Sequence, residues 1–288
     1  MRDAVNEVCS VVRRLAAQIG TCSGVFAVLA GCGGAGPATS LGGGQDPDPV
    51  VQDFPIAYVK RTLAFDEDGE PVSFDVRDPS AFSPGAELFM RERASVSADE
   101  TSITAGVFPD DEEGNPPLYD VKDVSVSADG SRLVFAMRAP EDPDLDDDEQ
   151  PKWNVWVYEI ETASLRRVIG SDIVAEDGHD IAPRFLPDDR IVFASTRQRQ
   201  AKAILLDEGK PQFSNFDEDR DNEAFVIHVM DDDGTNIRQI TFNQSHDLDP
   251  AVLDSGRIVF SRWDNVANVD RISLYTMNPD GTQMEVLY

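Results

Sequence analysis

The sequence predicts an all-β fold, a β-propeller of four-stranded antiparallel blades. Three observations lead to this prediction: one phrase recurs along the chain, β-rich segments joined by tight turns follow each copy, and sustained helical periodicity is missing. A single blade cannot bury both of its sheet faces, so blades stack on their neighbours. We therefore expect each repeat to form one blade.

The recurring phrase is clearest in the second half of the chain. "HDIAPRFLPDDRIVF" covers residues 179–193 and "HDLDPAVLDSGRIVF" covers residues 246–260. The two align without a gap and share a His-Asp head, a proline and an Arg-Ile-Val-Phe ending. A third copy, "VKDVSVSADGSRLVF" at residues 121–135, keeps the Arg-Leu-Val-Phe ending but has neither the His nor the Pro. The apolar ending predicts a strand at the same place in each repeat.

Two more strands are expected after each copy. The first comes from "WNVWVYEI", "AFVIHVMD" or "ISLYTMN", and the second from "LRRVIG", "IRQITF" or "MEVLY". The turns between them include Asp233-Gly234 and Asp280-Gly281, and Asp-Gly between apolar runs is a strong hairpin signal. Upstream, "FPIAYVKRTL", "ELFMRER" and "SITAGVF" are expected to be strands of an earlier or closing blade.

These patterns divide the chain into an N-terminal segment, a linker and a propeller. The expected boundaries are a signal peptide at 1–31, a flexible Gly/Pro-rich tether at 32–52, and a partial propeller at 53–288, with an irregular first blade at 53–120 and clear blades at 121–170, 171–242 and 243–288. The longest connections, at 136–152 and 195–223, both fall between the second and third strands of a repeat. Insertions in one connection decorate one rim, where we expect a protein partner or a small ligand to bind.

The N-terminus is predicted to carry an export signal. After Arg13 and Arg14 comes an apolar stretch that ends in Leu-Ala-Gly-Cys at residues 29–32, which resembles a bacterial lipoprotein signal. The resemblance implies that Cys32 is lipidated and anchors the protein to the membrane, on the periplasmic side of the outer membrane in the cell envelope. The alternative is an ordinary buried helix. Because Cys9 and Cys22 would be removed with the signal, no disulfide is expected.

Composition narrows the class of partner. The chain has 288 residues, 41% of them hydrophobic, and its 25 Lys and Arg face 54 Asp and Glu for a net charge of -29. That acidic field repels nucleic acid and favours cations or basic partners. We therefore expect no nucleic-acid binding.

The repeats resemble those of a known family. Pro183, Asp188-Asp189 and the Ile-Val-Phe of residues 191–193, with "MDDDGTNIRQIT", look like the β-propeller repeats of the TolB family. More narrowly, "FPIAYVKR", "LFMRERAS" and "SRLVFAMRA" resemble the middle, or propeller, domain of proteins related to the hydrazine synthase alpha subunit. The resemblance implies a ring of six or more blades, whereas about three to four are present here. The expected propeller is therefore incomplete.

Sequence motifs for catalysis are not found. The chain has no G-x-S-x-G nucleophile elbow, no C-x-x-C-H haem motif and no Walker-type phosphate loop. We leave open whether the protein is an enzyme, with the balance against catalysis in this span.

His179-Asp180 and His246-Asp247 are candidate binding residues, because equivalent positions in consecutive blades would lie near the mouth of the central channel. Two imidazoles with two carboxylates suit a divalent metal or a polar ligand. The alternative is that each His-Asp pair bonds its own blade. We expect His228, inside a strand, to be structural.

Calcium is the one cofactor the sequence suggests. Asp217, Asp219, Asp221 and Glu223 have the alternate spacing of carboxylates in a calcium loop, although Asn222 replaces the turn glycine. Asp142, Asp144 and Asp146 share that spacing, and solvated loops are the alternative for both sets. The three tryptophans are expected to pack within blades, not to form a ligand cage.

Two functions follow from these observations. The first is an exported, lipid-anchored propeller that acts as a binding scaffold without catalysis. The second is a non-catalytic propeller domain of a larger periplasmic enzyme, hydrazine synthase alpha-like or hydrolase-like, whose catalytic part lies beyond Tyr288.

Overall fold

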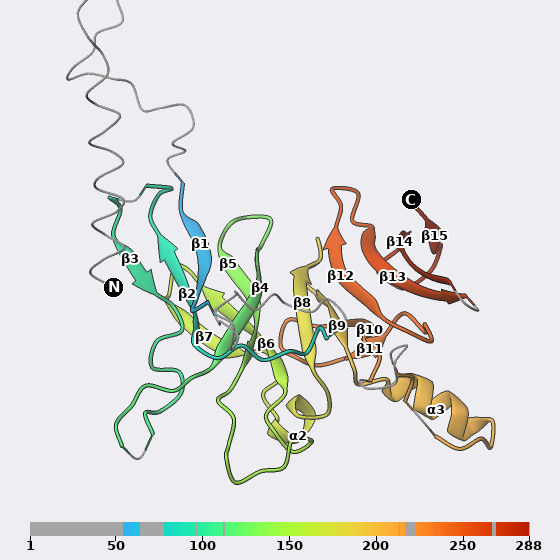
Figure 1. The fold of residues 1–288 in the computed structure, drawn as a ribbon. Helices are drawn as coiled ribbons and strands as arrows, with labels where there is room; N and C mark the ends of the chain where they lie inside the picture. Colours follow the sequence, from blue (N-terminus) through green and yellow to red (C-terminus); the bar gives the residue numbers. More distant parts are fainter. Residues whose placement is uncertain are drawn as a thin grey trace, which may run out of the picture. The chain divides into compact units, whose positions relative to one another are not determined.

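The computed structural model describes residues 54–63, 78–95, 97–111, 113–212, 214–216, 223–266 and 269–287. They form four antiparallel sheets that follow one another along the chain (Figure 1). The first sheet contains β1 (Ile56–Arg61), β2 (Ala86–Arg91) and β3 (Glu100–Ser102). The others have four strands each: β4 (Asp120–Val126), β5 (Arg132–Arg138), β6 (Trp153–Glu159) and β7 (Ser164–Arg167); β8 (Asp180–Phe185), β9 (Ile191–Ser195), β10 (Val226–Met230) and β11 (Arg238–Gln239); β12 (Asp247–Val252), β13 (Ile258–Val266), β14 (Val269–Met277) and β15 (Glu285–Val286).

The strand order within each sheet is the order of the sequence, as in a meander. The predicted repeat of an inner strand, a Val-Phe strand and a hairpin is therefore confirmed in the three four-stranded sheets. Two of the three upstream segments form β1 and β2 as expected. The third was misplaced: β3 ends at Ser102, where "SITAGVF" begins.

The backbone repeats along with the sequence. The first strands β4, β8 and β12 each contain a bulge at the same place in the ladder. The bulge residue has a positive φ of 60° at Asp123, 51° at Ala182 and 50° at Asp249. A left-handed residue is uncommon outside glycine, so its recurrence identifies three copies of one unit.

The strand register corrects one alignment. The β4–β5 turn contains an extra residue, so the gapless alignment of the first copy is displaced along β4. Asp120, and not Val121, occupies the position that His179 and His246 have in the next two sheets. The gapless alignment missed this because it was made on the matching Arg-Leu-Val-Phe ending, which follows the extra residue.

Apolar side chains fill the spaces between consecutive sheets. The first strands lie next to one another, with β4 against β8 and β8 against β12. Leu88 and Phe135 belong to the cluster between the first two sheets, Phe193 to the next cluster, and Phe225 and Phe260 to the last. Each of the five is at most 1% exposed, so inter-blade packing supplies the core.

The two predicted Asp-Gly turns pack closely against the preceding blade. Gly234 has φ +81°, and a Cβ there would lie 2.4 Å from the carbonyl oxygen of Val168, just after β7. Gly281 has φ +85°, and its Cβ would lie 2.6 Å from the carbonyl oxygen of Ile240, just after β11. Glycine is required at both turns by conformation and by space.

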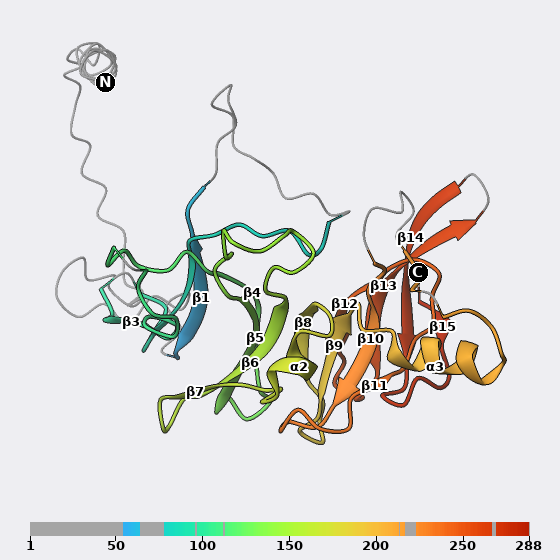
Figure 2. The same ribbon diagram turned by 90° about the horizontal axis from the view of Figure 1, so that it is seen from below.

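Two connections contain short helices: α2 (Asp172–Ala175) lies between β7 and β8, and α3 (Arg199–Asp207) lies in the long connection between β9 and β10 (Figures 1 and 2). The sequence did not predict α3, because this helix has nine residues and buries none of them, so no sustained apolar face marks it. No helix in the described part of the chain is long and apolar enough to cross a membrane.

Candidate functional site

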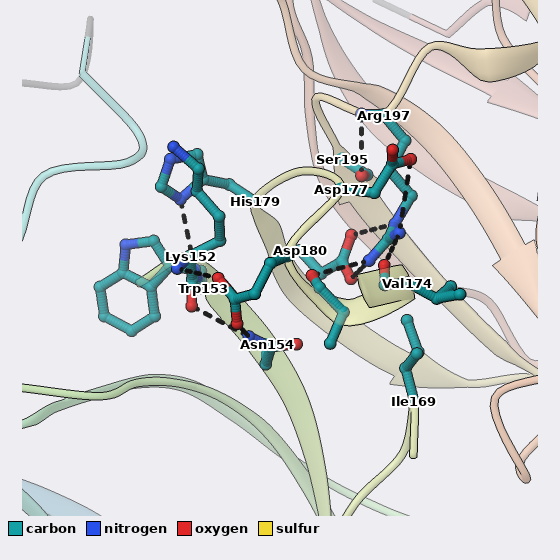
Figure 3. Close-up of polar contacts among 12 residues, drawn as sticks. Lys152, Trp153, Asn154, Ile169, Val174, Asp177, His179, Asp180, Ser195 and Arg197 are labelled. Atoms are coloured by element: carbon teal, nitrogen blue, oxygen red, sulfur yellow. Dashed lines mark hydrogen bonds and ion pairs between the residues drawn. The ribbon is translucent and has the colours of Figure 1, made fainter. Parts of the chain in front are cut away.

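The two histidines of the repeated His-Asp heads connect neighbouring blades. His179 precedes β8, and its Nδ1 accepts a hydrogen bond of 3.2 Å from the backbone N–H of Trp153, at the start of β6 in the preceding sheet (Figure 3). His246 precedes β12, and its Nδ1 accepts a bond of 3.1 Å from the backbone N–H of Phe225, next to β10. Both imidazoles thus satisfy a buried main-chain donor at a blade junction.

This role requires a neutral imidazole. Burial lowers the pKa of His179 to about 3, and the positive charges of Lys152, Arg138 and Lys122 act in the same direction. At neutral pH the ring therefore keeps the lone pair that accepts the bond.

The two aspartates of the repeated heads form buried ion pairs. Asp180 is fully buried and receives Arg197 in a bidentate ion pair, with Nε to Oδ1 at 2.9 Å and a second bond from Nη2 to Oδ2 (Figure 3). Asp247 is equally buried and receives Arg262 through two bonds of 2.8 Å. Burial raises the pKa of both carboxyl groups, while the arginines oppose that rise.

The four head residues therefore lie in two junctions, one per blade, where each His Nδ1 accepts a backbone N–H and each carboxylate binds an arginine. The rings of His179 and His246 both contact Phe225, with centroids 6.4 Å and 5.9 Å away. Within the described residues no group of three His, Cys, Asp or Glu could hold a metal ion. Sequence reasoning missed the paired arginines, because Arg197 and Arg262 do not occupy equivalent positions of the aligned repeats.

Two other predicted sites fall largely on residues that the structure does not describe. Cys32 lies outside the described residues, and so do Asp217, Asp219 and Asp221 of the calcium loop. Glu223, the last member of that loop, is described and forms an isolated β-bridge with Phe216.

The tryptophans do not come together. Trp153 is fully buried and donates from Nε1 to the carbonyl oxygen of Ser80 at 2.8 Å. Trp156 packs on a different apolar cluster, and Trp263 contacts the ring of His246. They are packing residues in three separate places.

A groove of about 1140 Å³ lies on the rim that carries the long connections. Three connections contribute to it: β1–β2 through Phe82 and Pro84, β3–β4 through residues 108–111, 113 and 115–118, and β5–β6 through residues 140–143. The sequence predicted binding on this rim from the β5–β6 insertion. It did not identify the β3–β4 connection, which lacks the repeat pattern.

The groove combines carboxylates with apolar surface. Its acidic lining residues are Asp110, Asp111, Glu113, Glu141 and Asp142, and none of its lining residues is basic.

Hydrogen bonds within the lining fix the position of Asp111. Asp111 accepts bonds from the backbone and side chain of Asn115 at 2.7 and 2.8 Å, which lower the pKa of Asp111. Leu118 is 61% exposed, and six prolines line the walls. Such a lining suits an extended segment that carries both basic and apolar side chains.

The sequence and the structure were both compared with those of known proteins. No protein-family model matches the sequence, and no curated protein matches it. The hydrazine synthase structure of Kuenenia stuttgartiensis aligns with a TM-score of 0.50 and 15% identity, over 73% of this chain and 29% of that chain.

Two further structures align less well. TolB from Acinetobacter baumannii has a TM-score of 0.41 and 14% identity over 83% of this chain and 54% of its own. The tricorn protease has a TM-score of 0.45 and 12% identity over 83% and 27%. The chain thus spans less than a third of the hydrazine synthase chain that it matches, and its sheets share the β-propeller fold of that structure.

Proposed function

We propose that this protein is an exported, lipid-anchored propeller that binds a partner protein through the acidic groove on its rim. The observation that supports the proposal is the groove itself, with five carboxylates, no basic residue and a volume of about 1140 Å³. Small-molecule pockets usually have about 300–1,000 Å³. A groove just above this range, with exposed Leu118 and several prolines, suits an extended polypeptide segment.

A labelled peptide tests the binding. The probe is a proline-containing peptide that alternates lysine and leucine, with glutamate in place of lysine as its control. Fluorescence anisotropy should show binding of the lysine peptide, weakened by salt because the contacts are exposed ion pairs.

Matched variants locate the binding on the protein. The triple change Asp110→Asn, Asp111→Asn and Glu141→Gln should weaken binding roughly tenfold, since each exposed ion pair contributes about 0.5 kcal/mol. The control changes Asp144, Asp146 and Asp147 to Asn, because these carboxylates belong to the β5–β6 connection, as Glu141 does, but do not line the groove. Equal weakening by both triples would show general charge attraction and contradict the groove.

The lipid anchor is tested separately. Intact mass spectrometry of a membrane extract should show an acylated Cys32 as the first residue of the mature protein. A Cys32→Ser variant should lose membrane association in fractionation of the cell envelope. An unchanged distribution of this variant would refute lipidation without affecting the groove.

A second function is favoured by one observation. The alignment with hydrazine synthase covers only 29% of that chain. The alternative is a non-catalytic propeller domain of a larger periplasmic enzyme. The coding sequence after Tyr288 distinguishes the two functions, since an enzyme should encode a C-x-x-C-H haem motif or a nucleophile motif there.

A further inference from the structure

A second, smaller cavity lies beside α3, and it shares no lining residue with the acidic groove. Its volume is about 290 Å³, and its lining residues are Arg197, Arg199, Gln200, Ala203, His228, Ile237 and Gln239. Helix α3 contacts β11 here, and both ribbon views show the helix beside that strand (Figures 1 and 2). The lining is chemically unlike the groove, since it contains two arginines and no carboxylate.

His228 presents a hydrogen-bond acceptor to this cavity. The side chain is only 2% exposed, and its Nδ1 lies 2.9 Å from the carbonyl oxygen of Val226. A carbonyl oxygen only accepts, so Nδ1 carries the proton and Nε2 carries the lone pair of the neutral ring. No described residue bonds to Nε2. His228 lines the cavity, so a ligand bound there can donate a hydrogen bond to this lone pair.

The protonation state agrees with this geometry. Burial lowers the pKa of His228 to about 4, so the ring is neutral at physiological pH. The nearby charge of Arg197 lowers this pKa as well, while Asp177 and the bond to Val226 oppose the change. Because the ring is buried, a neutral hydroxyl suits Nε2 better as a donor than a charged ammonium group.

The N-terminus of α3 supplies hydrogen-bond donors that complement the acceptor of His228. The backbone N–H groups of Arg199 and Gln200 belong to the first helical turn and have no acceptor among the described residues, whereas the N–H of Ala201 bonds to Gln239 Oε1 at 3.2 Å. The side chain of Arg199 uses Nε to bond Asp177, which leaves its two Nη groups available. Free N–H groups with a guanidinium are typical of a site for a carboxylate.

We propose that this cavity binds a small α-hydroxy acid, with its carboxylate at the α3 N-terminus and Arg199, and its hydroxyl donating to His228 Nε2. Ile237 and Ala203 provide the apolar contact for a short alkyl chain. Arg197 takes no direct part, because its Nε and Nη groups are occupied by Asp180 and by backbone carbonyls. The chemistry is independent of the partner proposed for the groove.

Three matched probes test the proposal by calorimetry with the purified chain: leucic acid, which is the α-hydroxy analogue of leucine, then leucine, and then isocaproate, which has neither group. Leucic acid should bind most tightly. Isocaproate and leucine should each bind roughly tenfold more weakly, because one loses the bond to His228 and the other places an ammonium near Arg197. Equal affinity for leucic acid and isocaproate, or no saturable binding of leucic acid, would overturn the proposal.

Two variants and one spectroscopic readout identify the residues. Arg199→Leu should weaken leucic acid binding roughly tenfold or more, whereas Lys202→Leu, which removes a cation from the same helix outside the cavity lining, should not. With ¹⁵N-labelled histidine, leucic acid should move the Nε2 resonance of His228 and leave those of His179 and His246 in place. The variant His228→Phe assigns that resonance. A stationary His228 signal during saturable binding would contradict the assigned pose.

Discussion

Two blade junctions of this molecule use one structural position for opposite chemistry. At the junction before β8, a neutral His179 accepts the N–H of Trp153. At the junction before β4, Asp120 occupies the equivalent position, accepts the N–H of Ser83 at 2.7 Å and pairs with Arg61 at 2.8 Å. The geometric requirement is one acceptor for a buried N–H, and either side chain meets it.

The difference lies in the cost of burial. An imidazole is buried in its uncharged form, and its pKa falls as a result. A carboxylate is charged, so burial raises the pKa of Asp120 and the Arg61 guanidinium opposes that rise. A blade that uses Asp at this position therefore needs a cation from the neighbouring sheet, and a blade that uses His does not.

The largest expected effect comes from the ion pair beside the histidine junction. Asp180→Ala leaves the guanidinium of Arg197, whose side chain is 1% exposed, buried without its carboxylate. This should lower the free energy of unfolding by about 3–5 kcal/mol, measured by urea denaturation. Asp188→Ala is the control, because Asp188 is exposed and pairs with the partly exposed Arg190. A loss as small as that of the control would mean that the buried pair is unimportant.

The next effect concerns the turn that closes the same junction. Gly234→Ala adds a Cβ at 2.4 Å from the Val168 carbonyl oxygen in a left-handed conformation. We expect a loss of about 2–4 kcal/mol in thermal or urea unfolding. Gly130→Ala shares the positive φ but meets nothing within 4 Å, so it should cost about 1–2 kcal/mol. Equal losses would show that the left-handed conformation alone, and not the contact with the Val168 carbonyl oxygen, causes the loss of stability.

A smaller effect is expected at the histidine itself. His179→Leu removes the acceptor of the Trp153 N–H and should cost about 1–3 kcal/mol. His179→Asn keeps an acceptor near the Nδ1 position and should recover part of the loss. His179→Asp should be worse than Asn at neutral pH, because Lys152, Arg138 and Lys122 lie near this position but none is bonded to residue 179 as Arg61 is to Asp120. If Asp equals Asn, the contrast between the junctions is wrong.

The pH dependence of stability is the smallest and sharpest test. The pKa of His179 is about 3 in the folded protein and about 6.5 in an unfolded chain, so the unfolded state binds the proton first. The contribution of His179 is complete above pH 6.5 and is lost as pH falls toward 3. Between pH 7 and pH 5.5, His179→Asn should lose about 1 kcal/mol less stability than the parent. Parallel pH profiles of the two proteins would disprove a neutral buried imidazole.

Much of the fold could be predicted from the chain alone. The recurring Arg-Ile-Val-Phe ending and the two Asp-Gly turns predicted strands and hairpins, because these signals are local. Helix α3 and the short β3 were missed, since neither buries a periodic face. The groove was predicted only as a rim, because its walls come from three connections far apart in the sequence.

Local sequence was enough to show that blades repeat, since strand alternation and turn chemistry are properties of neighbouring residues. Packing between blades was needed to show what the His-Asp heads do, which cations neutralise the buried aspartates and which carboxylates share a groove. Those outcomes depend on distances between residues from different blades. A buried polar group takes its role from the partner that packing brings to it.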